Sequence, residues 1–285
     1  MISKVKPLTR ISCLILLFLV VSISTTAQDS IWVTYMSGGM RALERGNYGD
    51  AEKLFRAAIR EAAKAKDSGN KKAVGMMLDS LEGLGGALRG QKRYADAERV
   101  VRESLQLLEM ATTDSDPKYS LTLNNLGLLL TEEKKFKEAE ETHRKALTLR
   151  EKYDGPPRRN FAVSLLNLGV LLYEQGDVVE SEPFFNQARG ILSKIPIAEL
   201  TQSDFDNILM CDHNLGLIYT EQKKYDDAEL RFKAAIAFTE KLKGENHPDL
   251  ILYLQSYANL LRLINRAPLA ARVEARIKRI RDGMR

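Results

Sequence analysis

The residues of this sequence that could carry out chemistry are few and scattered. The 285 residues include three histidines, His143, His213 and His247, and two cysteines, Cys13 and Cys211. No pair of these histidines has the spacing that places two metal ligands on one face of a helix. No serine or cysteine lies in a recognisable nucleophile motif. The sequence therefore predicts a protein that is not an enzyme and that has no metal site and no cofactor.

A cluster of glycines could be mistaken for a phosphate-binding loop. It consists of Gly83, Gly85, Gly86 and Gly90. A phosphate-binding loop lies between a strand and a helix, whereas these glycines lie inside a run with helical periodicity. We expect them to permit close contact between helices, at a cost of up to about 1 kcal/mol of helix stability for each glycine.

The elements that must position any functional residue are copies of one unit, which recurs every 42 to 47 residues. One copy has Gly127 followed by Leu130, Phe136, Ala139 and Ala146. The same offsets begin at Gly39, Gly85, Gly169, Gly216 and, in a degraded copy, Ala258. A fixed period of this length is typical of a solenoid, in which each unit buries its apolar face against the next.

Each copy has the pattern of two helices joined by a short polar turn. Apolar residues recur at intervals of three and four, and small residues such as Gly127 and Ala139 would let the two helix axes approach to about 8–10 Å. His143 occupies the position of Phe55, Phe185 and Phe232 in other copies. We therefore expect His143 to be a partly buried core residue. Cys211 is expected to be buried as a small apolar side chain.

Three short sequence motifs resemble those of a known family. They are Leu-x-Asn-Leu-Gly-x-x-Leu, Tyr-x-x-Ala-Glu, and Gly-Glu-Asn-His-Pro-Asp at 244–249. With the 42-residue spacing, they resemble the tetratricopeptide repeat (TPR) of the kinesin-light-chain type, over residues ~32–283. The resemblance implies an all-α, right-handed superhelical solenoid of about six helix-turn-helix repeats. The expected repeats are about 32–66, 70–112, 118–153, 160–193, 205–243 and 248–283.

The first 27 residues have the pattern of a secretory signal peptide. A basic start is followed by an apolar run of 13 residues, Ile11 to Ile23, and then by small residues before a cleavage site near Ala27. The run is shorter than the roughly 20 residues that cross a bilayer. We expect residues 28–285 to form one exported solenoid domain, periplasmic or secreted. An uncleaved anchor is the alternative.

Charge is distributed unevenly along the chain. Without residues 1–27, 40 Lys and Arg face 38 Asp and Glu, so a general nucleic-acid surface is not predicted. Residues 262–285 carry eight basic and two acidic residues, without interleaved aromatic residues. This segment is interpreted as a solvated capping helix. The alternative is contact with an anionic partner, a membrane surface or an acidic protein. Membrane contact is expected only through this helix or an uncleaved signal.

A polar stripe recurs beside the glycines. Asn125, Asn167 and Asn214 lie two residues before a glycine, and Glu132, Glu174 and Glu221 lie five residues after one. The two positions are seven residues apart and share one helix face. The resemblance places this face on the inner wall of the solenoid. The apolar or aromatic residues beside it are Leu128, Val170, Tyr173 and Leu217.

These ten residues are the candidate peptide-binding residues. An amide side chain offers both donors and acceptors to the backbone of an extended peptide. Alternatively, the asparagines bond a neighbouring helix end and fix the stacking. The sequence thus predicts a non-catalytic scaffold that binds a protein or peptide. A self-associating assembly component and an accessory subunit of an exported enzyme are the alternatives, and the oligomeric state stays open.

Overall fold

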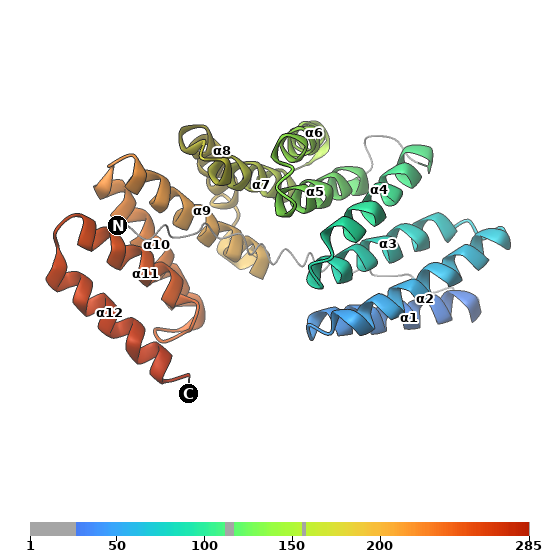
Figure 1. Ribbon diagram of the computed structural model, residues 1–285, viewed down its shortest axis with the longest axis horizontal. Coiled ribbons are helices and arrows are strands. Elements are labelled where there is room, and N and C mark those ends of the chain that lie inside the picture. Colours follow the sequence, from blue (N-terminus) through green and yellow to red (C-terminus); the bar gives the residue numbers. More distant parts are fainter. Residues whose placement is uncertain (1–26, 112–116, 156–157, 285) are drawn as a thin grey trace. The chain divides into compact units, whose positions relative to one another are not determined.

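The computed structural model describes residues 27–111, 117–155 and 158–284. Within these ranges the chain forms twelve α-helices and one 3₁₀ turn, η1 (Ile197–Glu199), and no strand (Figure 1). The helices are α1 (Ala27–Glu44), α2 (Tyr48–Asp67), α3 (Ala73–Gly90), α4 (Tyr94–Ala111), α5 (Pro117–Glu132), α6 (Phe136–Tyr153), α7 (Arg159–Gln175), α8 (Val178–Leu192), α9 (Gln202–Glu221), α10 (Tyr225–Lys243), α11 (Leu250–Leu263) and α12 (Ala267–Asp282). The expected signal peptide lies outside the described residues, except for Ala27.

Consecutive helices pair into six hairpins, and each hairpin corresponds to one copy of the sequence repeat. Within a hairpin the first helix packs along the second, as α7 does along α8. Within α1 to α6 and within α7 to α12, the second helix then packs on the first helix of the following hairpin, as α2 does on α3 and α10 on α11. The predicted all-α repeat solenoid is therefore confirmed. The right-handed sense of the superhelix stays a prediction.

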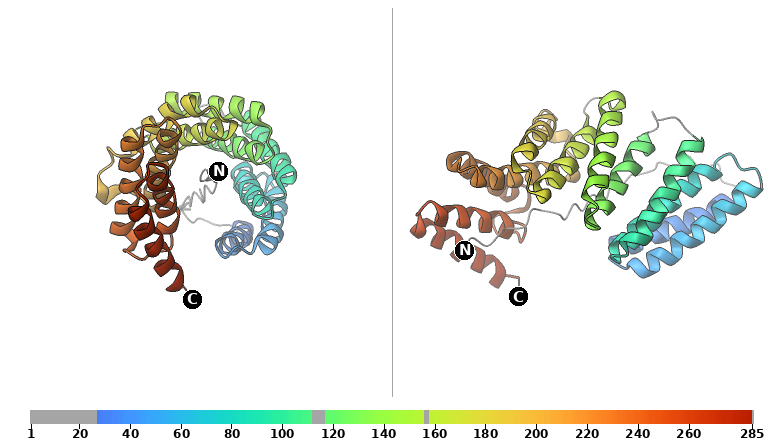
Figure 2. Two further views of the ribbon diagram at one scale, coloured as in Figure 1. Left: turned by 60° about the vertical axis from the view of Figure 1, so that its left-hand side comes forward. Right: turned by 45° about the horizontal axis from the view of Figure 1, so that its top comes forward.

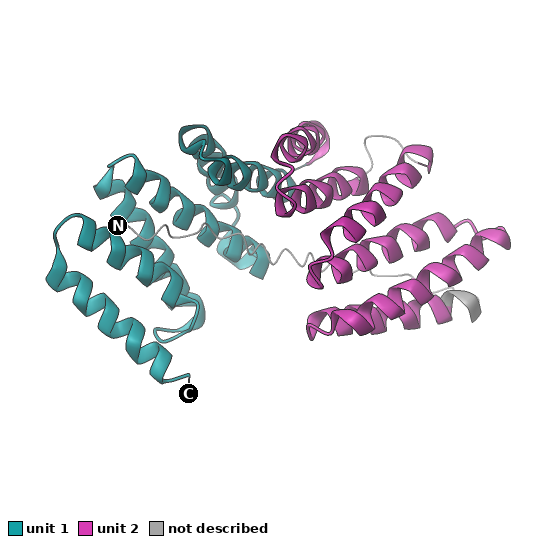
Figure 3. Cartoon of the chain, in the orientation of Figure 1, with its two compact units in different colours: residues 1–15, 155–285 teal, residues 16–154 magenta. Residues whose placement is uncertain are grey.

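The hairpins belong to two compact units (Figure 3). Unit 1 contains α7 to α12, and unit 2 contains α1 to α6. Each unit is described by itself below. That residues 28–285 form one continuous domain stays a prediction.

Within each unit the first helices of the hairpins form the inner side of the stack. Helix α1 contacts α3 in unit 2, and α9 contacts both α7 and α11 in unit 1. The second helices of neighbouring hairpins lie farther apart, on the outer side, as the hairpins within each unit show in Figure 2. The inner surface of each unit is therefore built from the faces of its first helices.

Close contact between a glycine and a ring holds the two helices of a hairpin together. A Cβ atom added at Gly127 would lie 2.5 Å from the ring of His143, and one added at Gly216 would lie 2.5 Å from Phe232. His143 is fully buried, so its predicted core position is confirmed and its burial is more complete than expected. A Cβ atom at Gly83 would lie 2.3 Å from Phe55, which confirms that this glycine permits close helix contact.

The turn inside each hairpin has one repeated geometry. The residue seven positions after the repeat's glycine (or after Ala258) has a positive φ in every hairpin. These residues are Gly46, Lys92, Lys134, Gly176, Lys223 and Asn265, and the three lysines have φ near 60°. This left-handed residue ends the first helix, since the next backbone N–H bonds back to a carbonyl in the last turn, as Lys135 does to Leu130 at 2.8 Å. A common turn gives all six hairpins the same relative helix orientation.

Candidate functional site

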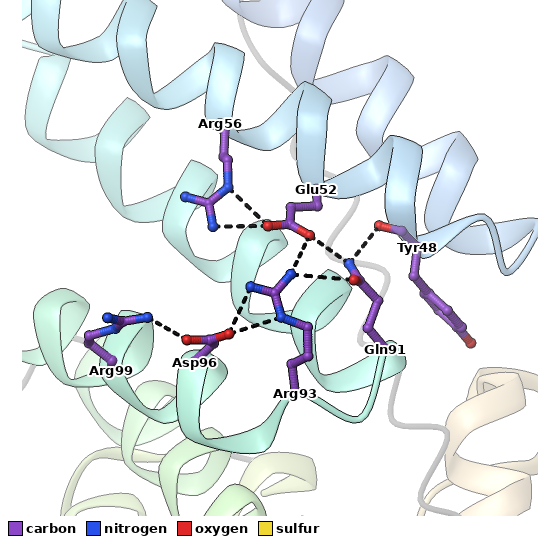
Figure 4. Close-up of polar contacts among 7 residues, drawn as sticks. All are labelled: Tyr48, Glu52, Arg56, Gln91, Arg93, Asp96 and Arg99. Carbon is purple, nitrogen blue, oxygen red and sulfur yellow. Dashed lines mark hydrogen bonds and ion pairs between the residues drawn. The ribbon is translucent and has the colours of Figure 1, made fainter.

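A glutamate on the second helix of one hairpin bonds the turn of the next hairpin. In the first pair, Glu52 accepts hydrogen bonds from Gln91 Nε2 at 2.8 Å and Arg93 Nη1 at 2.9 Å (Figure 4). Arg93 is also ion-paired with Asp96 at 2.7 Å. The hydrogen bond from Gln91 and the nearby arginines lower the pKa of Glu52 despite partial burial. The glutamate therefore stays ionised and fixes the register between the two hairpins.

The same contact recurs in both units. The glutamate belongs to the motif Tyr-x-x-Ala-Glu or occupies its place, and we call Glu52, Glu98, Glu182 and Glu229 the clasp glutamates. The recurring contacts are Glu98 to Lys135 at 2.7 Å, Glu182 to Gln222 at 2.8 Å and Glu229 to Arg266 at 2.8 Å. Burial raises the pKa of Glu98, but hydrogen bonds led by the one from Lys135 outweigh it and lower the pKa to about 2. The clasps align the inner faces of successive first helices.

The asparagines of the polar stripe differ in their surroundings. Asn214 on α9 is fully buried. Its Nδ2 donates to the Met210 carbonyl at 2.9 Å in its own helix, and its Oδ1 has no hydrogen-bond partner within the described residues. Asn167 on α7 is buried as well. Asn125 on α5 is half-buried and lies in unit 2. The bond of Asn214 thus stays within α9 and leaves a buried acceptor unused.

Two of the three stripe glutamates contact the preceding hairpin. Tyr173 on α7 donates its hydroxyl to Glu221 on α9 at 2.7 Å, and burial followed by this bond raises the pKa of Tyr173. At the equivalent place in unit 2, Arg89 on α3 is ion-paired with Glu132 on α5 at 3.6 Å. Glu174 is half-buried at the end of α7. These contacts join adjacent first helices at the end of the inner wall.

The apolar candidates lie on the same faces. Val170 on α7 and Leu217 on α9 are buried, and Leu128 on α5 is half-buried. Seven of the ten predicted residues lie on α7 and α9 of unit 1, where Tyr173 bonds Glu221: Asn167, Asn214, Glu174, Glu221, Val170, Tyr173 and Leu217. Asn125, Leu128 and Glu132 share α5 in unit 2. That these residues contact a ligand stays a prediction.

One histidine forms a pair that resembles part of a hydrolytic site. His213 Nε2 lies 2.9 Å from the hydroxyl of Ser256, but both side chains are buried in the core between α9 and α11. Burial lowers the pKa of His213 to about 4. The neighbouring Asp212 is ion-paired with Arg189 and Arg231. No carboxylate therefore orients the imidazole, because His213 Nδ1 has no hydrogen-bond partner in the described part of the chain.

Other kinds of site have little support among the described residues. Within those ranges no three His, Cys, Asp or Glu side chains are grouped as metal ligands would be. Cys211 is buried, as predicted, and burial raises the pKa of its thiol. None of the described helices combines the length and the apolar character needed to cross a membrane.

The chain matches family models over most of its length. Two models, each described as tetratricopeptide repeat, match it: one over residues 76–152, 118–194 and 207–281, the other over 37–109. No curated protein matches the chain.

Solved structures of low sequence identity share the fold. BtubC (BKLC) from P. vanneervenii is 17% identical with a TM-score of 0.69, and the match covers 91% of this chain and 93% of that one. A putative kinesin light chain from Podosopora anserina is 15% identical with a TM-score of 0.62, covering 73% and 96%. A Rap protein complexed with Competence and Sporulation Factor is 15% identical with a TM-score of 0.60, covering 91% and 77%.

Proposed function

Because the chain belongs to the tetratricopeptide-repeat family, we propose that it is a non-catalytic scaffold that binds a peptide or an extended protein segment on the inner faces of its first helices. The related Rap protein is complexed with a factor, which supports a binding role for this fold. The fold itself hosts many functions, so the binding surface is identified from the chain's own residues.

The observation that carries the proposal is the recurrence of accessible polar and apolar side chains on first helices of both units. Asn125 and Leu128 on α5, and Tyr173 and Glu174 on α7, are half-buried, so each leaves part of its side chain open to a ligand. Asn214 is fully buried and its Nδ2 is bonded to Met210 within α9, so it would support this surface from behind and would not contact a ligand. The stacking alternative instead requires the amide to bond a neighbouring helix end, and the observed bond of Asn214 does not do this.

The accessible side chains suit an extended segment. Val170 and Leu217 are buried and support the inner faces of α7 and α9, while Tyr173 with Glu221 forms a polar edge. In unit 2 a peptide backbone would bond Asn125 and its apolar side chains would contact Leu128, and in unit 1 it would bond the polar edge.

The test is a peptide-display selection against the protein, followed by affinity measurements on the selected peptides. We expect Asn125→Ala together with Tyr173→Phe to weaken binding by about tenfold or more, since two accessible hydrogen-bonding groups are lost. Asn186→Ala, on the second helix α8, serves as the control. Binding that survives the double substitution in a variant with unchanged helicity and melting would contradict the inner-wall site.

We also propose that the scaffold works in an exported compartment. The support is the signal-peptide pattern of residues 1–27. Expression of the full chain in a secretory host, followed by fractionation and N-terminal sequencing, tests this. A new N-terminus near Gln28 in the exported fraction is expected, and an intact, intracellular chain would contradict it.

A further inference from the structure

The sixth hairpin differs from the others on the face where a following hairpin would pack. On α10, Phe232, Ile236 and Thr239 are buried within two turns of one another, and Phe232 packs against Gly216 and His213 of α9. Ile236 packs in one cluster with Leu250 and Tyr253 of α11. The residues 42 positions later on α12 are Glu274, Lys278 and Arg281. The equivalent surface of α12 is therefore charged where that of α10 is mostly apolar.

The clasp is also lost at this place. Each of the first five hairpins has a glutamate at the clasp position, which is Glu140 in the third hairpin. Helix α12 has Ala271 at this position. Inside the array, the second helix supplies a carboxylate and the following turn supplies a cation or an amide. On α12 the same face instead supplies the cations Lys278 and Arg281 beside the carboxylates Glu274 and Asp282. The second helix thus offers cations at positions 42 residues after apolar or neutral residues of α10.

The two cations are unpaired and border a groove. Lys278 and Arg281 are exposed, and neither forms an ion pair within the described residues. The groove has a volume of about 410 Å³, and its lining residues are Gln255, Glu274, Ile277, Lys278, Arg281 and Asp282. It lies between α11 and α12, which is the seat that the first helix of a following hairpin would take. Glu274 is already ion-paired with Arg262 at 2.7 Å.

We propose that this face of α12 binds an acidic helical segment of a partner protein. The seat between two helices fits a helix, and Lys278 with Arg281 would pair with its carboxylates. Opposite potentials steer encounter and select partners. A second copy of this chain stacked through its first hairpin fits poorly, because that hairpin has Asn47 at the position that Arg93, Lys135 and Arg266 occupy in other hairpins, and an amide does not neutralise Lys278 and Arg281.

The experiment measures binding of a labelled acidic helical peptide to the protein expressed from its full coding sequence. The peptide carries glutamates three and four residues apart on one face, and a matched peptide has glutamine in their place. We expect Lys278→Glu with Arg281→Glu to weaken binding of the acidic peptide by about tenfold. The charge-matched control is Arg272→Glu with Arg279→Glu, which changes the other exposed side of α12 and should have less than about a threefold effect.

A charge swap completes the test. A peptide with lysine in place of its glutamates should bind the Lys278→Glu, Arg281→Glu variant better than it binds the unaltered protein. Equal losses in both double variants would overturn the proposal, as would equal binding of the glutamine peptide. Binding of α12 to phosphatidylserine vesicles, without binding of the acidic peptide, would also overturn it and would identify a membrane surface as the ligand.

Discussion

Helices α10 and α12 occupy the same place in consecutive hairpins, yet the faces that they offer to a next hairpin are chemically opposite. Helix α10 buries Phe232 and packs Ile236 against α11, and its clasp glutamate Glu229 binds Arg266. Helix α12 offers Glu274 and Lys278 at the corresponding positions. The comparison teaches that stacking depends on two separable features, an apolar seat and a carboxylate clasp. Both are changed together on α12.

The largest expected difference concerns the apolar seat. Phe232→Ala should lower the free energy of unfolding by about 3–5 kcal/mol, because a large buried side chain is removed from contact with Gly216 and His213. The equivalent substitution on α12, Glu274→Ala, should change it by less than about 0.5 kcal/mol, since its ion pair with Arg262 is solvated. Urea denaturation of both variants checks this. Similar losses in both would show that α12 also stacks on something through this face.

The next contrast is in acid sensitivity. His213 is buried beside Phe232 and Tyr253, and burial lowers its pKa from 6.5 to about 4. The unfolded chain therefore binds more protons than the folded one between these values. Stability is complete above pH 6.5 and falls as the pH decreases toward 4, by up to about 3 kcal/mol for this residue.

Unfolding midpoints measured from pH 7 to pH 4 check the acid sensitivity. In the equivalent position α11 has Gln255, so His213→Gln is the matched substitution. This substitution should remove the part of the pH dependence that comes from His213. The part that comes from His143 should remain, because burial also lowers the pKa of His143 to about 4. The control is His247→Gln in the loop before α11. If His213→Gln left the pH dependence of the unfolding midpoint unchanged, the prediction that protonation of this buried imidazole destabilises the fold would be wrong.

The smallest effect is expected at the clasp. Glu229→Ala removes the acceptor for Arg266 and Tyr257 and should lower the free energy of unfolding by about 1–2 kcal/mol. Ala271→Glu, the reverse change on α12, should have almost no effect because no following turn faces it in the described residues. Thermal melts of both variants at low and high salt measure these changes in stability. A loss with Glu229→Ala that does not shrink in high salt would argue against an ionic clasp.

The repeat pattern predicted the hairpins well because it depends on local chemistry. The expected repeats 160–193 and 205–243 correspond to α7–α8 and α9–α10. Periodic apolar residues and the small residues at each glycine position suffice for this. The position of His143 in the core also follows from its alignment with phenylalanines.

The pairings between hairpins were not predicted, because they join residues that are about one repeat apart. Glu52 binds both Gln91 and Arg93, whereas Glu98 binds Lys135 and Glu182 binds Gln222, so no single residue type marks the clasp partner. Asp212 stands where other repeats have a core leucine, such as Leu165, and is held by Arg189 from α8. Only the tertiary structure shows that Arg231 on α10 also forms an ion pair with the buried carboxylate of Asp212.

The sequence by itself therefore determined the helices, the turns and the repeat register, since these depend on side-chain size and on periodicity within some 40 residues. The tertiary structure decided which polar groups of the inner wall are satisfied. Among the described residues it left the amide oxygen of Asn214 without a donor, and it joined Tyr173 to Glu221. Such outcomes depend on distances between neighbouring helices, and a hydrogen bond is made or lost within a few tenths of an ångström.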